Sequence, residues 1–430
     1  MSELKERIKG RLGDLLPLKY GKSLPAAVRD STGSVPVYGS SGVVGNHSAA
    51  LTRGPAIIVG RKGNVGAVHY SAVPCWPIDT AYFAEAPIGH DPRYYRYLLS
   101  SLGLAQLDKS TAIPGLSRDD YNAVEVTIHP PEQQAEVVAE IEKQFSRLDE
   151  AVANLQRVKA NLKRYKASVL KAAVEGRLVE TEASIAQREG RNYETGEQLL
   201  QRILEERRAK WAGRGKWKVP ESPSADTPLP DGWVWSCIDQ LADVGTGATP
   251  KRDKAVYWND GDVPWVTSSV VNGDYVDEAS EFVTKLALAE TNLTLYPVGT
   301  LLVAMYGEGK TRGKCAELRI PATTNQALAA LQVAAPLRGY VRQFLELNYE
   351  EMRKVASGGV QPNLNLSLVR SVCVPLPPLA EQIRIVSEID RHLSIVRGVE
   401  AEIDTNLKRA QALRQSVLTD AFKHPPDISK

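Results

Sequence analysis

PPEQQAEVVAEIEKQFSRLDEAVANLQRVKANLKRYKASVLKAAVEG, residues 130–176, decides the fold, because the stretch recurs near the end of the chain. Shifted by 248 positions it falls on residues 378–424 without a gap. Residues shared by the two copies and the segments before them include Pro114/Pro362, Leu116/Leu364, Gln134/Gln382, Glu140-Ile141/Glu388-Ile389 and Ser168-Val169-Leu170/Ser416-Val417-Leu418. A gapless match of this length indicates an internal duplication.

Both copies are expected to form long helices. Apolar residues of the first copy follow the four- and three-residue steps of a coiled coil, at Ile141, Phe145, Leu148, Val152, Leu155, Leu162 and Val169. The second copy keeps this register from Ile389 to Val417, except where Glu400 and Arg414 replace apolar residues. Each copy starts just after a pair of prolines, where a helix needs no N–H donor. About 44 residues would make a rod of roughly 65 Å.

The charge pattern favours pairing of the two helices with each other. In each copy acidic residues concentrate near the start and basic residues near the end. Antiparallel packing would place opposite charges side by side and oppose the helix dipoles favourably. The charges alone fit equally well an ordinary solvated helical hairpin. The duplication favours an antiparallel coiled coil.

Whole-chain properties exclude several classes of protein. The 430 residues suffice for two to four domains, and the net charge of +2 neither requires nor excludes nucleic acid. No apolar run approaches the ~18 residues that span a bilayer, so we expect a cytoplasmic protein without a membrane partner. The four cysteines are isolated, which suggests neither a disulfide framework nor a zinc site.

The segments outside the two long helices also resemble each other. Val35-Pro-Val-Tyr-Gly is echoed by Val263-Pro-Trp-Val, and the glycine-bounded turn 60–66 by 307–313. We therefore predict an α+β fold, in which two similar α/β globular domains and two antiparallel long helices form a pseudo-twofold internal repeat. The expected segments are domain 1 (1–128), long helix 1 (129–177), a linker with one helix (178–229), domain 2 (230–375), long helix 2 (376–424) and a tail (425–430).

Basic and small polar residues cluster on matching loops of the two domains. The first pair of loops carries Arg61, Lys62 and Asn64 in domain 1 and Lys310, Thr311, Arg312 and Lys314 in domain 2. A second pair carries Lys109, Ser110, Thr111 and Arg118 in domain 1 and Ser357, Gln361 and Asn363 in domain 2. Such side chains bind phosphates or read base edges through paired hydrogen bonds. For each residue taken alone a solvated turn is the more common explanation, but equivalent positions in the two domains make the set a candidate DNA-binding surface.

The sequence offers weak evidence for catalysis. Ala304-Met-Tyr-Gly-Glu-Gly-Lys310-Thr311 satisfies a relaxed phosphate-binding-loop pattern, but that pattern requires a helix to begin at Lys310-Thr311. Arg312-Gly-Lys-Cys315 instead predicts a turn and a strand. The six histidines lack metal-ligand spacing. We therefore expect no catalytic and no metal site, and keep an ATPase using Lys310 as the weaker alternative.

Four further features are distinctive: Pro130-Pro-Glu-Gln-Gln, Pro375-Leu-Pro-Pro-Leu-Ala-Glu-Gln-Ile, the two Ser-Val-Leu helix ends, and Leu229-Pro-Asp-Gly-Trp-Val-Trp at the start of the second domain. With these features the arrangement resembles the specificity subunit of type I restriction-modification systems. The first domain opens with Leu12-Gly-Asp-Leu-Leu and lacks the Pro-x-Gly-Trp sequence, so its start is not fixed.

The resemblance implies that each globular part is a target recognition domain for one half of a bipartite DNA sequence, with the long helices setting the spacer between the halves. It implies double-stranded DNA, two methyltransferase subunits and restriction subunits as partners. S-adenosylmethionine, ATP and magnesium would belong to those partners, with no cofactor in this chain. A coiled-coil adaptor with a ligand other than DNA is the alternative of another class; its binding would depend little on salt, whereas DNA binding weakens steeply.

Overall fold

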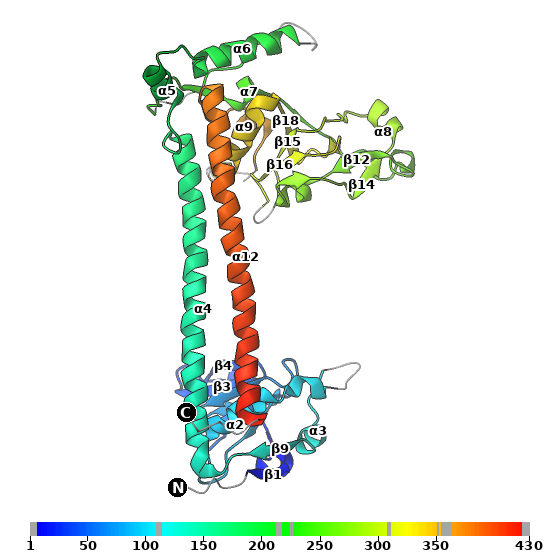
Figure 1. Ribbon diagram of the computed structural model, residues 1–430. Helices are drawn as coiled ribbons and strands as arrows, with labels where there is room; N and C mark the ends of the chain where they lie inside the picture. Colours follow the sequence, from blue (N-terminus) through cyan, green and yellow to red (C-terminus); the bar gives the residue numbers. More distant parts are fainter. Residues whose placement is uncertain are drawn as a thin grey trace. The chain divides into compact units, whose positions relative to one another are not determined.

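A computed structural model describes residues 7–108, 114–211, 217–223, 225, 227–307, 311–350, 352–353 and 363–423. The chain divides into two compact units: unit 1 contains residues 1–159 and 401–430, and unit 2 contains residues 160–400. The division falls inside the two long helices, α4 (Pro131–Val174) and α12 (Leu379–Lys423), which are each continuous (Figure 1). Each unit therefore contains one globular part and a portion of both helices.

The globular part of unit 1 contains three small sheets. A four-stranded sheet has the order β2-β8-β5-β6, a three-stranded sheet the order β4-β3-β7, and β1 pairs with β9. The strands are β1 (Ile8–Arg11), β2 (Lys19–Tyr20), β3 (Val35–Gly39), β4 (Gly42–His47), β5 (Ala56–Gly60), β6 (Val68–Ser71), β7 (Trp76–Pro77), β8 (Ala81–Ala84) and β9 (Glu125–Ile128). The helices are α1 (Leu12–Leu15), η1 (Ala26–Val28), α2 (Pro92–Ser101), η2 (Leu104–Leu107) and α3 (Arg118–Asn122).

Unit 2 repeats this plan with more residues. Its sheets have the orders β11-β18-β15-β16-β13 and β14-β12-β17, and β10 pairs with β19. The strands are β10 (Val234–Cys237), β11 (Ala242–Thr246), β12 (Val263–Val266), β13 (Tyr275–Val276), β14 (Glu281–Val283), β15 (Leu301–Ala304), β16 (Cys315–Leu318), β17 (Thr323–Thr324), β18 (Leu328–Val333) and β19 (Cys373–Leu376). The helices are α5 (Glu182–Glu189), α6 (Gly196–Ala209), α7 (Ile238–Leu241), η3 (Ala255–Tyr257), η4 (Ser268–Asn272), α8 (Lys285–Glu290), α9 (Ala335–Leu347) and α11 (Leu366–Arg370).

Strand pairing confirms the internal repeat expected from the sequence. In unit 1, β3 pairs antiparallel with β4 and parallel with β7; in unit 2, β12 pairs antiparallel with β14 and parallel with β17. The β5–β6 hairpin corresponds to the β15–β16 hairpin, and each pairs on its other side with a later strand, β8 or β18. The echo between Val35-Pro-Val-Tyr-Gly and Val263-Pro-Trp-Val therefore reflects equivalent strands.

Equivalent glutamines fix the start of the two long helices. Gln134 Nε2 donates to His129 O at 3.0 Å, and Gln382 Nε2 donates to Pro377 O at 2.8 Å. Both glutamines are buried, at 0% and 1% exposure. An unpaired buried amide would be costly, so each glutamine holds the turn that joins the preceding strand to its helix.

The predicted coiled-coil stripe is on the inner side of the helices. Ile141, Phe145 and Val169 of α4 are buried, as are Ile389, Leu393, Val396 and Ile403 of α12, whereas the middle of the α4 stripe, from Leu148 to Leu162, is half-buried. In unit 1, Asp149 pairs with Arg414 at 2.9 Å and Lys159 with Asp404 at 2.6 Å, which is the antiparallel register. Exposed pairs of this kind contribute about 0–1 kcal/mol each. Apolar burial therefore stabilises the pairing more than the charges do.

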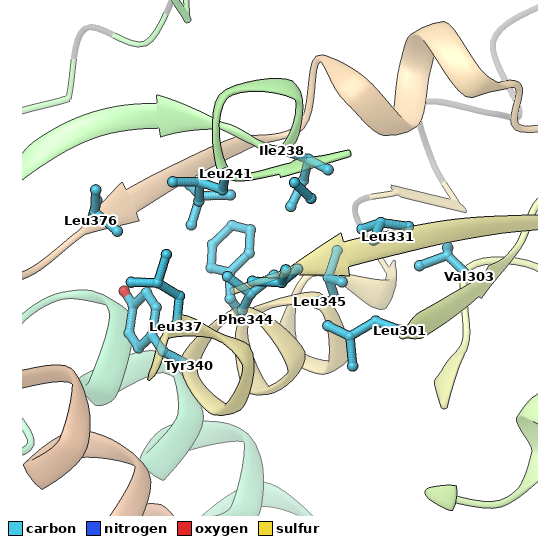
Figure 2. Packing of buried hydrophobic residues seen from close by; sticks show 14 of the residues in the cluster. Ile238, Leu241, Leu301, Val303, Leu331, Leu337, Tyr340, Phe344, Leu345 and Leu376 are labelled. Carbon is cyan, nitrogen blue, oxygen red and sulfur yellow. The ribbon is translucent and has the colours of Figure 1, made fainter. Parts of the chain in front are cut away.

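The core of unit 2 lies between α9 and its large sheet. Figure 2 shows Phe344 and Leu345 of α9 packed beside Leu331 of β18, with Ile238 and Leu241 of α7 nearby. Burying each such side chain contributes about 1.5–3 kcal/mol. The helix is also fixed by its one buried hydroxyl, because Tyr340 Oη donates to Pro375 O at 2.7 Å.

The segment 178–229, expected to be a linker with one helix, differs from that prediction in its number of helices and in its packing. It contains two helices, α5 and α6, and Leu199, Leu200 and Ile203 of α6 are buried in the core of unit 2 with Trp233. The reading as a spacer was therefore wrong. A capping box from Thr195 to Gln198 opens α6, and the short α5, between its Thr181 cap and Gly190, is the helix that the prediction missed. The six segment boundaries otherwise stay a prediction.

Candidate nucleic-acid interface

The β5–β6 turn carries the first group of predicted contact residues. Arg61 N and Lys62 N both donate to Thr80 O, at 3.0 and 3.1 Å, and Lys62 forms a bridge with Gly115. Gly66 has a φ of +72° and comes so close to η2 that a Cβ would lie 2.4 Å from Ala105 N. The turn is thus held by main-chain bonds on two sides, which leaves the Lys62 and Asn64 side chains exposed.

Arg61 and Arg118 come together over one aromatic ring. Each guanidinium lies 5.2 Å from the centroid of the Tyr20 ring. Arg61 also donates from Nη1 to Asp79 O at 2.9 Å. Arg118 is placed by α3, whose first turn is capped by the Ser117 side chain. The structure therefore brings together two residues that the sequence places 57 positions apart.

Tyr20 is the member of this arginine–tyrosine cluster that the sequence analysis missed. Its ring is 52% exposed and packs edge-on against Tyr82 at 5.1 Å. Burial raises the pKa of the Tyr82 hydroxyl, which donates to Leu116 O at 3.1 Å. An exposed tyrosine between Lys19 and Lys22 is the interleaving of basic and aromatic residues that could have pointed to this site.

The β15–β16 turn carries the corresponding group in unit 2. Lys314 Nζ donates to Asn272 Oδ1 at 3.2 Å, and Lys314 N to Thr311 O at 3.0 Å. The main-chain oxygen of Arg312 accepts from Arg353 at 3.2 Å, while Arg312 Nε is buried without a hydrogen-bond partner among the described residues. The described part of this turn therefore contains two cationic residues, Arg312 and Lys314, and is in contact with a third, Arg353.

Equivalent leucines hold the second pair of loops against these turns. Leu116 N donates to Arg61 O at 2.9 Å in unit 1, and Leu364 N donates to Met305 O at 3.1 Å in unit 2. Both side chains are buried, at 3% and 2% exposure. Exposed Asn363 thus lies next to the β15–β16 turn, as Arg118 lies next to the β5–β6 turn. In each unit the described end of the second loop therefore lies against the glycine-bounded turn.

Part of the predicted set cannot be placed. Lys109, Ser110, Thr111, Lys310, Ser357 and Gln361 lie outside the described residues. The assignment of all fourteen predicted residues to DNA contact stays a prediction, because the structure contains no DNA.

Unit 2 has its own tyrosine between two arginines. Arg319 and Arg342 lie 3.5 and 4.5 Å from the ring centroid of Tyr275 on β13. Arg342 Nη1 also donates to the Tyr275 hydroxyl at 2.7 Å. Each arginine faces an aspartate as well, Asp277 at 3.3 Å and Asp274 at 3.7 Å. This group is therefore closer to electrical neutrality than the one around Tyr20.

The described residues lack the features that the catalytic alternatives require. Thr311 to Leu318 form a turn and then β16, so no helix begins after the glycine-rich loop as nucleotide binding would need. Within the described ranges no group of three His, Cys, Asp or Glu could hold a metal ion. His129, a candidate base by type, is buried and bonded to Tyr94 Oη at 2.8 Å. None of the helices searched, all among described residues, has the length and apolarity of a membrane span.

This chemistry fits a polyanion. Paired cations over an exposed tyrosine, beside an exposed lysine and asparagine, can bind phosphates and offer donors to base edges. The family described as "Type I restriction modification DNA specificity domain" matches the chain twice, over residues 6–164 and 230–408. The matches cover more than half of the chain. The chain belongs to this family. Its two specificity domains coincide with the two repeats, each match including a globular part and most of the long helix that follows.

Curated relatives of this specificity-domain chain are distant. The EcoR124I/EcoR124II specificity subunit of Escherichia coli is 23% identical over 45% of this chain and 50% of the relative. The MjaIX specificity subunit of Methanocaldococcus jannaschii is 23% identical over 49% and 47%. The chain thus spans about half the length of these relatives. The match to the Escherichia coli EcoDI specificity subunit, 22% identical, covers 96% of this chain and 87% of that one.

Solved structures share the fold of this specificity-domain chain. A chain from a structure on complex assembly and conformational transition of the type I R-M system has a TM-score of 0.64 at 18% identity, covering 97% of this chain and 98% of that one. The HsdS subunit from Thermoanaerobacter tengcongensis has a TM-score of 0.54 at 17% identity, with 97% of both chains covered. The predicted fold class is confirmed.

Proposed function

We propose that this chain is the DNA sequence-specificity subunit of a type I restriction-modification complex. The observation that carries the proposal is the coincidence of two specificity-domain matches with two structurally equivalent repeats. Each repeat presents a glycine-bounded turn with basic residues, supported by an adjacent loop. A chain with two such readers recognises a DNA sequence in two halves, one for each globular part.

The chain contributes recognition and scaffolding, and the partners contribute the chemistry. S-adenosylmethionine, ATP and magnesium belong to methyltransferase and restriction subunits in this proposal. The duplication offers two equivalent places for two methyltransferase subunits. Apolar side chains exposed on the long helices support such docking: Val158 and Leu413 in unit 1, and Tyr165, Ile383 and Ile395 in unit 2. The proposed role places the protein in the cytoplasm.

The test is to co-express the chain with the methyltransferase and restriction genes encoded beside it and to map methylated adenines in host DNA. The expected result is one bipartite motif with a fixed gap. Exchanging residues of the β5–β6 turn should change one half of the motif, and exchanging residues of the β15–β16 turn should change the other. Methylation without a bipartite motif would refute the proposal. So would a result in which the β5–β6 exchange and the β15–β16 exchange give the same methylation motif.

The adaptor alternative is tested by the salt dependence of binding. Neutralising phosphates releases counterions, so DNA affinity should fall with a log–log slope of about −0.9 for each contact. An affinity that is constant between low and physiological salt would favour a ligand other than DNA. The ATPase alternative would require ATP hydrolysis by the isolated chain that is lost in Lys310→Ala.

A further inference from the structure

A cavity of about 400 Å³ in unit 2 lies between the end of α4 and the globular part. Four cationic side chains line it: Lys163 and Lys166 from α4, Lys314 from the β15–β16 turn, and Arg342 from α9. The acidic residues in its wall are Asp274 and Glu346. Positive charge is therefore in excess in this cavity.

The ion pairs show which cations are uncompensated. Lys166 pairs with Glu346 at 2.7 Å, and Arg342 faces Asp274 at 3.7 Å. Among the described residues, the Lys314 ammonium has only the neutral Asn272 oxygen as a partner, at 3.2 Å. Lys163 is exposed and forms no ion pair with any residue that the structure describes. Two ammonium groups on different elements thus line the cavity without a carboxylate partner in the part of the chain that the structure describes.

The internal repeat provides a built-in comparison. Unit 1 has a cavity of about 620 Å³ whose α12 lining includes Gln411, Arg414, Gln415 and Leu418. These four residues lie 248 positions after Lys163, Lys166, Ala167 and Leu170 of the unit 2 cavity, so the same helix positions line both cavities.

The charge of the two cavities differs at these matched positions. Neutral Gln411 stands where unit 2 has Lys163, and Arg414 is neutralised by Asp149 at 2.9 and 3.3 Å. The remaining charged residues of the unit 1 cavity, Arg96 and Glu142, have opposite signs. The fold therefore accounts for both cavities, but it does not account for the excess charge in unit 2.

We propose that the unit 2 cavity binds a phosphate group of the DNA backbone, with Lys163 and Lys314 as its ligands. A lysine ammonium is a compact charge suited to a phosphate oxygen, and two of them share the charge of one phosphodiester. A phosphate is favoured over an acidic peptide because Lys314 is on the turn proposed to contact DNA. Through this site the long helix takes part in DNA binding, and only the second half-site receives the contact.

This site rests on the proposed function, and salt dependence tests it. The probe is a 40-base-pair duplex of random sequence, bound to the complex of the chain with its methyltransferase subunits. Affinity is measured by fluorescence anisotropy over a series of NaCl concentrations. The test variant is Lys163→Gln, which installs the residue that the first repeat has at the equivalent position. The control is Lys171→Gln, which removes the same charge from the same helix outside the cavity, where Lys171 lies 3.8 Å from Glu175.

The expected loss in Lys163→Gln is one phosphate contact. The log–log slope should become shallower by about 0.9, so the ratio of wild-type to variant affinity should fall about threefold between 50 and 200 mM salt. Lys314→Gln should act alike, and the double variant should lose little more than either single variant, because one lysine alone does not hold the phosphate. Lys171→Gln should keep the wild-type slope.

Several results would overturn the site. An unchanged slope in Lys163→Gln, with wild-type complex binding DNA, removes the site and leaves the proposed function intact. Equal effects of Lys163→Gln and Lys171→Gln would show a general charge effect. Loss of co-purifying methyltransferase in Lys163→Gln with an unchanged slope would assign the cavity to an acidic protein segment. If the wild-type complex binds no duplex, the site and the proposed function both fail.

Discussion

Replacement of Arg61 by alanine tests the candidate interface of unit 1 most directly. Arg61 contacts Tyr20 at 5.2 Å and Tyr82 at 5.9 Å, and donates one hydrogen bond to Asp79 O. Two cation–π contacts at a partly exposed site contribute about 0.5–1 kcal/mol each. A hydrogen bond to an exposed carbonyl adds about 1 kcal/mol. Arg61→Ala should therefore lower the stability of unit 1 by about 2–3 kcal/mol and leave it folded.

The effect on DNA binding depends on what Arg61 contacts. If the guanidinium reads a guanine edge, its removal should cost about 1–3 kcal/mol at one base pair of the first half-site and relax the preference there. If it binds a phosphate, affinity should fall equally for all sequences and the salt slope should become shallower by about 0.9. Arg61→Lys keeps the charge but loses the planar guanidinium. It should therefore restore DNA affinity if Arg61 binds a phosphate, and it should leave the base preference impaired if Arg61 reads a guanine.

The assay is binding of the assembled complex to its methylation motif and to every single-base variant of the first half-site, at two salt concentrations. The control is Arg53→Ala, which removes an exposed arginine from the same globular part, away from the β5–β6 turn. Thermal unfolding checks that both variants fold. Folded Arg61→Ala with wild-type affinity, slope and base preference would refute the assignment of this turn to DNA contact.

Three further predictions concern the long helices, pH and the loop supports. Inserting four residues into both helices, beside Leu155 in α4 and Leu407 in α12, adds about 6 Å to each helix. Selection from random DNA by the assembled complex should then give a longer gap between unchanged half-sites. An unchanged gap would refute the idea that the long helices set the spacer length. Burial lowers the pKa of His129 to about 4. Because the folded state then binds fewer protons than the unfolded state between about pH 4 and 6.5, unit 1 should lose about 3 kcal/mol of stability on acidification through that window. Denaturant unfolding at pH 7 and 4.5 measures this loss, which His129→Gln should reduce; equal pH dependence in the variant contradicts the assignment. Leu116→Ala and Leu364→Ala should each cost about 2–5 kcal/mol in their own unit, and methylation mapping should show a weakened preference in one half-site only, a different half for each variant.

The long helices could be predicted from sequence because their signals are local. Proline pairs fix both starts, and the repeated apolar register carries both helices to within a few residues of Val174 and Lys423. The shift of 248 positions then identified Leu116 and Leu364 as equivalent before their equivalent main-chain bonds were known. Because the duplication presents each element twice, a weak pattern in one copy can be interpreted with the help of the other copy.

The remaining features depend on contacts between distant parts of the chain. Tyr20 belongs to the site because Arg61 and Arg118 lie over it, and no local pattern records that meeting. The apolar face of α6 was visible in the sequence, but its cover, which includes Trp233, was not. Composition alone made that segment look like a spacer. In the sequence, only the Thr181 N-cap and the terminal Gly190 indicate the short helix α5.

The buried glutamines at the helix starts have a consequence for exchanging specificities. Gln134 and Gln382 make the same bond to the carbonyl five residues earlier, so the joint between globular part and helix has the same local construction in both repeats. Cutting the chain directly after β9 and after β19 would keep both glutamine hydrogen bonds with the long helices. These two junctions are therefore suitable places to graft a new recognition domain. A hybrid that keeps the hydrogen bond should retain the native connection between globular part and helix.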